Sequence, residues 1–260
     1  MKRTLTASLG FLAMAMAPAI AADIPVKAPR LAPVAAYSWT GLYTASTIGI
    51  QWWDISGPYV AFPDDNHNTR GSRALFGSHA GYQQQFGNWV LGVEVGYNTG
   101  YNPRYTSSNS ISADCLGGAI AFVADRTCHS RINNYWTAGA KVGWAWDTWM
   151  VYATGGYANG RVDTLTTVTS VGVLTSETTA RQSGWYVGVG FDVFVTKFMW
   201  SDVILGLEYQ HVDLGRVTHI DTLGVAPAGD NDRNLRATDD VIRAKLTFKY
   251  NFAGPVVARY

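Results

Sequence analysis

The chain alternates between apolar and small or polar residues over eight segments, each long enough to form a β-strand. In one of them Trp89, Leu91 and Val93 share one face, whereas Gly92 and Glu94 share the other. A period of two predicts strands whose two faces meet different surroundings. The eight segments lie near residues 40–52, 73–85, 89–99, 132–146, 149–161, 182–195, 199–212 and 240–252.

Short and long connectors alternate between these segments. The tight connectors are Phe86–Asn88, Asp147–Thr148 and the stretch near Thr196–Phe198, and the long ones lie near 53–72, 100–131, 162–181 and 213–239. This alternation is typical of a barrel that crosses an outer membrane, because one set of turns faces the periplasm and the other faces the exterior. We therefore predict an all-β fold, an eight-stranded antiparallel up-and-down transmembrane β-barrel over residues 39–252, with both termini on the periplasmic side.

In hydrocarbon each unpaired backbone group costs several kcal/mol, so the sheet is expected to close on itself. Its apolar faces would then contact lipid, and its polar faces would line the interior. The charges predicted to point into this lumen are Glu94, Lys141, Asp192, Glu208, Arg243, Lys245 and Lys249. They suit either a plug of paired charges or an ion-selective pore, and the narrow interior of an eight-stranded barrel favours the plug.

Aromatic residues recur at the predicted strand ends. The periplasmic set is Trp39, Trp89, Trp146, Trp149, Trp200 and Phe252. The opposite set is Trp52, Tyr97, Tyr157, Trp185 and Tyr209. Two such sets predict aromatic girdles at the two membrane interfaces.

The N-terminal segment has the features of an export signal. Lys2 and Arg3 precede a short apolar run, Leu9–Ala17, and a small-x-small pattern at Ala19–Ala21. We predict a signal peptide over residues 1–22, a Pro/Ala-rich periplasmic leader over 23–38 and a periplasmic tail over 253–260. After this signal, no segment approaches the roughly 20 consecutive apolar residues of a transmembrane helix.

Composition agrees with a wall that faces lipid. Hydrophobic residues make up 47% of the chain and aromatic residues 13%, but charged residues only 15%. The net charge of +1 gives no strong attraction to nucleic acid. The expected partners are therefore outer-membrane lipid and lipopolysaccharide, with Arg233 and Arg236 as candidate phosphate contacts in the last long connector.

Cys115 and Cys128 are predicted to form a disulfide, because the periplasm is oxidising. Three histidines near the outer connectors, His67, His129 and His219, are weak candidates for binding haem. No HxxxH or HExxH spacing is present, so neither a metal site nor a resident cofactor is predicted. No nucleophile and base are arranged for catalysis, and we predict no enzyme.

Several stretches resemble one family. They are Ala21–Pro29, Tyr37–Tyr43, Leu246–Phe252 and Gly254–Tyr260. Together they resemble the alphaproteobacterial outer-membrane immunogenic proteins, which include RopB-like and hemin-binding surface proteins. The resemblance implies an OmpA-like eight-stranded barrel exposed at the cell surface, and Phe252 resembles the terminal aromatic residue that the barrel-assembly machinery reads. The glycine-poor stretch Thr44–Ile50 and the cysteine pair depart from the family pattern.

The function predicted from these observations is non-enzymatic. We expect a barrel that supports envelope integrity and carries surface-exposed, antigenic loops. Two alternatives stay open: a narrow pore for small solutes or ions, and a surface receptor for haem or a host ligand.

Overall fold

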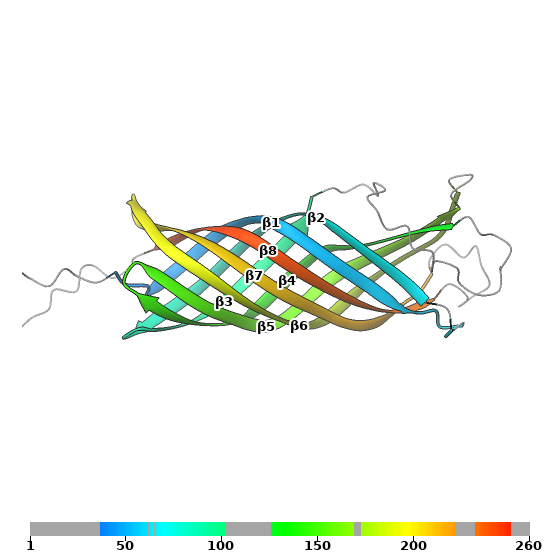
Figure 1. Ribbon diagram of the computed structural model, residues 1–260, viewed down its shortest axis with the longest axis horizontal. Helices are drawn as coiled ribbons and strands as arrows, with labels where there is room; N and C mark the ends of the chain where they lie inside the picture. The colour runs from blue at the N-terminus through cyan, green and yellow to red at the C-terminus, as the bar shows by residue number, and fades with distance from the viewer. Residues whose placement is uncertain are drawn as a thin grey trace, which may run out of the picture. The chain divides into compact units, whose positions relative to one another are not determined.

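The described residues form a closed antiparallel β-barrel (Figure 1). The computed structural model describes residues 37–61, 63–64, 66–101, 126–168, 173–221 and 232–250. Every described residue belongs to the compact unit Ala36–Tyr260. The strands are β1 (Gly41–Pro58), β2 (Asn66–Phe86), β3 (Trp89–Gly100), β4 (Arg126–Trp146), β5 (Trp149–Val168), β6 (Val173–Phe198), β7 (Ser201–His219) and β8 (Arg233–Tyr250).

Each strand pairs with its neighbours in sequence, and β1 closes the barrel by pairing with β8. Ile50 on β1, for example, lies opposite Ile242 on β8. Closure gives every strand a partner on both sides, which removes the open sheet edge that hydrocarbon would not tolerate. The predicted fold class is confirmed.

Three two-residue turns define one end of the barrel, which we call the short-turn end. They are Gly87–Asn88, Asp147–Thr148 and Met199–Trp200. The predicted position of the third turn, Thr196–Phe198, is wrong, because β6 continues through a register shift between Phe194 and Thr196 before it turns. We call the opposite end the long-connection end.

Several strands extend further toward the long-connection end than predicted. β2 begins at Asn66, β4 at Arg126, β6 at Val173 and β8 at Arg233. Much of the predicted long connectors 53–72, 162–181 and 213–239 is therefore strand. The sequence pattern does not predict these extensions, because the apolar and polar faces of the strands exchange there, as β1 and β8 show.

Along β1 the inward and outward faces exchange their character at Trp52. Just before this point the outward residues Ile48 and Ile50 are apolar, and the inward residues Thr47 and Gln51 are polar. After it, Asp54 points outward, whereas Ile55 is fully buried inside. A wall in hydrocarbon exposes apolar residues, and a wall in water exposes polar ones. The exchange therefore marks where lipid contact ends.

β8 shows the same exchange in the opposite chain direction. Arg236 and Thr238 point outward near its start, and Ile242 and Leu246 point outward further along. Inside, Leu235, Ala237 and Val241, interrupted by the buried Asp239, give way to the buried Arg243 at the same height. The barrel thus has a lipid-facing half with a polar interior and a water-facing half whose interior starts with an apolar cluster and then buries polar side chains such as His67, His219 and Arg233 near the long-connection end.

The apolar interior of the water-facing half is one packed cluster. Its members are Trp53, Ile55, Leu75, Ile132, Tyr135, Ala158, Val162, Tyr186, Val212, Leu214, Leu235, Ala237 and Val241. Side chains from seven strands meet there, so this half resembles the core of a water-soluble barrel.

Candidate functional site

The lipid-facing half of the interior contains a network of buried charges centred on Glu94. Its carboxylate accepts hydrogen bonds from Lys245 Nζ at 2.8 Å and from the Tyr43 hydroxyl at 2.8 Å. The Nδ1 atom of His79 lies 3.1 Å from the other carboxylate oxygen. Three neighbours therefore compensate one buried carboxylate, which would otherwise be costly to remove from water.

Glu208 forms a second centre beside the first. Arg243 donates to its carboxylate at 2.5 Å, and the Tyr152 hydroxyl donates at 2.7 Å. Lys245 Nζ lies 3.8 Å from the same carboxylate, which links the two centres. A second guanidinium nitrogen of Arg243 donates to Asn98 Oδ1 at 2.9 Å.

Two further ion pairs complete the network of buried charges. Lys141 Nζ lies 3.1 Å from Asp192 and 3.7 Å from the centroid of the Tyr152 ring. Lys249 Nζ lies 3.0 Å from Asp202. The structure places all seven predicted lumen charges inside the barrel, each beside an opposite charge. With Asp202 they make four cations and four anions, so this set carries no net charge.

Inward glycines provide the room for the two tyrosines of the network. A Cβ at Gly190 would lie 2.3 Å from Tyr152 Cζ, and a Cβ at Gly81 would lie 2.5 Å from the Tyr43 hydroxyl. Sequence reasoning missed both tyrosines, because the alternation is weak in β1 and β5. It also missed Asp202, although its parity with Glu208 on β7 would have placed it inside.

A short segment, residues 37–39, closes the barrel at the short-turn end, and we call it the cap segment. Trp39 is fully buried. Its backbone N–H donates to Gln85 Oε1 at 2.8 Å, and its indole N–H donates to the Asp147 carbonyl at 3.0 Å. Its own carbonyl accepts from Gln83 at 2.7 Å. The polar atoms of Trp39 are thus all bonded to barrel residues.

Tyr37 fixes the outer side of the cap segment. Its ring stacks on Phe194, with centroids 4.5 Å apart, and meets Trp39 edge-on at 5.0 Å. Lys249 Nζ lies 4.6 Å from the same ring and donates to the Ser38 carbonyl. Burial, aided by the charge of Asp202, raises the pKa of the Tyr37 hydroxyl well above its usual range, so it stays neutral. Tyr37 and Ser38, expected in the leader, therefore already contact the barrel.

The residues predicted for the periplasmic girdle lie in different places. Trp89, Trp146 and Trp149 lie exposed on the outer wall near the short-turn end, and Trp200 is exposed in a short turn. The prediction for Trp39 is wrong, because the backbone enters the barrel at this point and directs the indole inside. Phe252 lies outside the described residues.

The histidine candidates do not form an outward-facing site. His67 is fully buried, with Nε2 2.8 Å from the Ser130 hydroxyl, and His219 is fully buried beside Gln182 at 2.8 Å. Both had been expected near outer connectors, but the strands extend past them. His129 is half-buried on β4.

The two arginine candidates for phosphate contact lie on different sides of the barrel wall. Arg233 is buried and donates to the Thr166 hydroxyl at 2.8 Å, so its prediction as a surface contact is wrong. Arg236 points outward and pairs with Asp213. Cys115 lies outside the described residues, and for Cys128 only the backbone in β4 is described, so their disulfide stays a prediction.

Helices that could cross a membrane and clusters that could hold a metal ion are both absent from the described ranges. In these ranges, no helix is both long enough and apolar enough to cross a membrane. In the same part of the chain, no group of three or more His, Cys, Asp or Glu side chains is arranged to hold a metal ion.

Comparison with known sequences gives one consistent result. A family model described as "Outer membrane protein beta-barrel domain" matches residues 6–252. Two relatives, from Brucella melitensis biotype 1 and Brucella suis biovar 1, are each named "31 kDa outer-membrane immunogenic protein". Each is 30% identical to this chain over 230 residues, covering 85% of this chain and 90% of the relative.

The solved structures that match this chain share little sequence with it. Ail, the attachment invasion locus protein of Yersinia pestis, is 10% identical with a TM-score of 0.37, and the match covers 80% of this chain and 99% of Ail. OprG from Pseudomonas aeruginosa is 10% identical with a TM-score of 0.43, covering 82% of this chain and 98% of OprG.

Proposed function

Because the chain belongs to the outer-membrane immunogenic protein family of β-barrels, we propose that it is a closed, non-enzymatic barrel that supports envelope integrity and acts as a surface antigen. Family membership locates the protein in the outer membrane of a Gram-negative bacterium. The role of the barrel there is our inference from the way its two halves are built.

The exchange of faces at the long-connection end is the observation that carries this proposal. Beyond the ring of Trp52, Tyr157 and Tyr209 the wall is polar and an apolar cluster packs inside. On β5, the strand continues from Tyr157 to Val168. With about 3.4 Å per residue and a tilt of about 40°, this extension rises roughly 25–30 Å above the ring. Such a rigid, water-facing extension suits a protein that holds its connections above the lipid surface.

The interior supports a closed barrel. The charge network is balanced and paired, the cap segment closes the short-turn end, and the apolar cluster packs inside the other half. A narrow pore would need a continuous path for water, which neither paired charges nor packed apolar side chains favour. A haem receptor is also less favoured, because two of the three histidine candidates are buried in hydrogen bonds.

Surface exposure can be tested by labelling intact cells with a membrane-impermeant maleimide. We would place a cysteine at Ile220, which is exposed at the long-connection end, or at Met199, which is exposed in a short turn. Both variants carry serine at Cys115 and Cys128. We expect labelling of Ile220→Cys in intact cells, and of Met199→Cys only after the outer membrane is permeabilised. The reverse pattern would contradict surface display of the long-connection end.

Envelope support and closure need separate measurements. We expect a deletion strain to take up a hydrophobic fluorescent dye faster than its parent, and the wild-type gene to restore the barrier. We expect purified protein to give no conductance steps in planar bilayers. An unchanged barrier in the deletion strain would refute the supporting role, and regular conductance steps would refute closure.

A further inference from the structure

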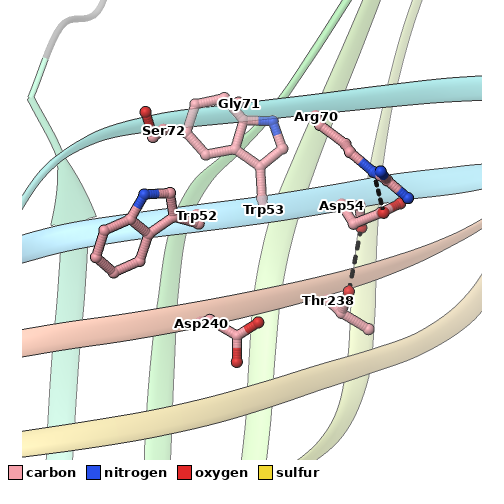
Figure 2. A pocket seen from close by; sticks show the side chains of 8 residues that line it. All are labelled: Trp52, Trp53, Asp54, Arg70, Gly71, Ser72, Thr238 and Asp240. Carbon is pink, nitrogen blue, oxygen red and sulfur yellow. Dashed lines mark hydrogen bonds and ion pairs between the residues drawn. The ribbon is translucent and has the colours of Figure 1, made fainter.

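The outer wall has a hollow at the height where its faces exchange character. It has a volume of about 450 Å³ and lies across β1, β2 and β8 (Figure 2). Its lining residues are Trp52, Trp53, Asp54, Arg70, Gly71, Ser72, Thr238 and Asp240. No part of the charge network or the cap segment contributes to it.

The hollow spans the boundary between hydrocarbon and lipid headgroups. Trp52 belongs to the outer aromatic ring, and the outward Ile50 and Ile242 lie on the membrane side of it. Asp54 and Arg70 lie on the water side, because they follow the exchange of faces. An occupant would therefore place acyl chains against the apolar wall and its headgroup against the charged residues.

The polar groups are arranged for a headgroup with both hydroxyl and phosphate groups. Arg70 Nε donates to Asp54 Oδ2 at 2.6 Å, yet 76% of the Arg70 side chain is exposed (Figure 2). A guanidinium has five N–H donors and can bind a carboxylate and a phosphate together. The exposed indole of Trp52 adds an apolar face beside these groups.

Asp240 provides a second carboxylate, held in a fixed orientation. Its Oδ1 accepts a hydrogen bond from the Tyr209 hydroxyl at 2.7 Å and lies 2.8 Å from His211 Nδ1. The hydroxyls of Ser72 and Thr238 also line the hollow. Carboxylates and hydroxyls beside an aromatic ring are groups that bind sugar hydroxyls through hydrogen bonds and the sugar ring through apolar contact.

From this arrangement we propose that the hollow binds the phosphorylated sugar headgroup of lipopolysaccharide in the outer leaflet. Arg70 binds a phosphate, Asp54 and Asp240 accept hydrogen bonds from sugar hydroxyls, and Trp52 packs against the sugar or the first part of an acyl chain. A glycerophospholipid fits less well, because it has no sugar ring to pack on Trp52 and to present several hydroxyls to the two carboxylates.

The test uses the full barrel refolded in detergent and titrated with lipid A, with binding followed by native mass spectrometry in the presence of a chelator. The chelator excludes bridging by divalent cations. Phosphatidylglycerol is the competing lipid. We expect lipid A to bind at least about tenfold more tightly than phosphatidylglycerol, which corresponds to about 1.4 kcal/mol.

Substitutions in the hollow should weaken lipid A binding selectively. We expect Arg70→Gln and Trp52→Ala each to weaken it about fivefold or more, and Arg70→Lys to retain most of it. The matched control is Arg161→Gln, because Arg161 also pairs with an aspartate on the barrel wall, Asp163 at 2.9 Å, but lies outside the hollow. This control should bind lipid A like the wild type.

Any one of three results would overturn the proposal. The first is equal affinity for lipid A and phosphatidylglycerol. The second is wild-type affinity in Arg70→Gln, and the third is an equal loss of affinity in Arg161→Gln. Each variant is first checked for the electrophoretic mobility shift of a folded barrel on heating. If Trp52→Ala does not fold, Trp52→Phe takes its place, and Arg70→Gln with Arg70→Lys still decides the question.

Discussion

Lys245 Nζ and Glu94 Oε2 lie 2.8 Å apart across the interior of the barrel, although two other strands separate β8 from β3 around the wall. Their side chains are 1% and 7% exposed. The pair therefore braces opposite parts of the barrel instead of reinforcing a single strand pair. Because both groups are buried, removing one leaves the other uncompensated.

Glu94→Gln is expected to lower the free energy of unfolding by about 3 kcal/mol, since it breaks a buried ion pair. Lys245 would keep only Glu208, at 3.8 Å. Urea unfolding in lipid vesicles, followed by tryptophan fluorescence, measures the loss. The double variant Glu94→Gln/Lys245→Met should recover part of it. A loss below about 0.5 kcal/mol would mean that the network is well hydrated.

Val189→Arg should impair folding by about 2–4 kcal/mol, because an outward arginine near mid-membrane must enter hydrocarbon. Val189 is 57% exposed on the outer wall of β6. The matched control is Thr218→Arg on β7, at an exposed position in the water-facing half. Folding yields in vesicles should separate the two. Equal tolerance at both positions would contradict the assigned lipid boundary.

The lipid-facing half could be predicted from the sequence because one rule governs it. In β3, Trp89, Leu91 and Val93 face hydrocarbon, and the period of two continues without interruption. The same rule placed Glu94 and Lys245 inside. Their mutual contact could not be predicted, because it depends on how far the barrel closes and not on either strand alone.

The sequence predicts loops in place of strands in the water-facing half, because there a second rule applies. At Asp54 and Ile55 the alternation continues but its two faces exchange. A strand predicted from an apolar, lipid-facing side therefore ends at that point. The burial of Trp39 could not be predicted either, since it depends on Asp147 and Gln85, which are distant in sequence.

Trp39→Ala is expected to lower the free energy of unfolding by about 3–5 kcal/mol, because it removes a fully buried aromatic side chain and its hydrogen bond. The matched control is Trp200→Ala, since Trp200 is 84% exposed in a short turn. That change should cost less than about 1 kcal/mol. Chemical unfolding of both variants in the same detergent gives the comparison. Similar losses would show that the cap segment contributes little to stability.

Ile55→Asp and Ser56→Asp test the exchange of faces at adjacent residues on β1. Ile55 belongs to the apolar cluster and is fully buried, whereas Ser56 points to the outer side and pairs in register with Arg236. A carboxylate at position 55 would lie without a partner in an apolar interior, so we expect a loss of at least about 3 kcal/mol. At position 56 water and Arg236 compensate the charge, and the change should stay within about 0.5 kcal/mol. Urea midpoints of the two variants decide the matter, and a larger loss for Ser56→Asp would place lipid, not water, against this part of the wall.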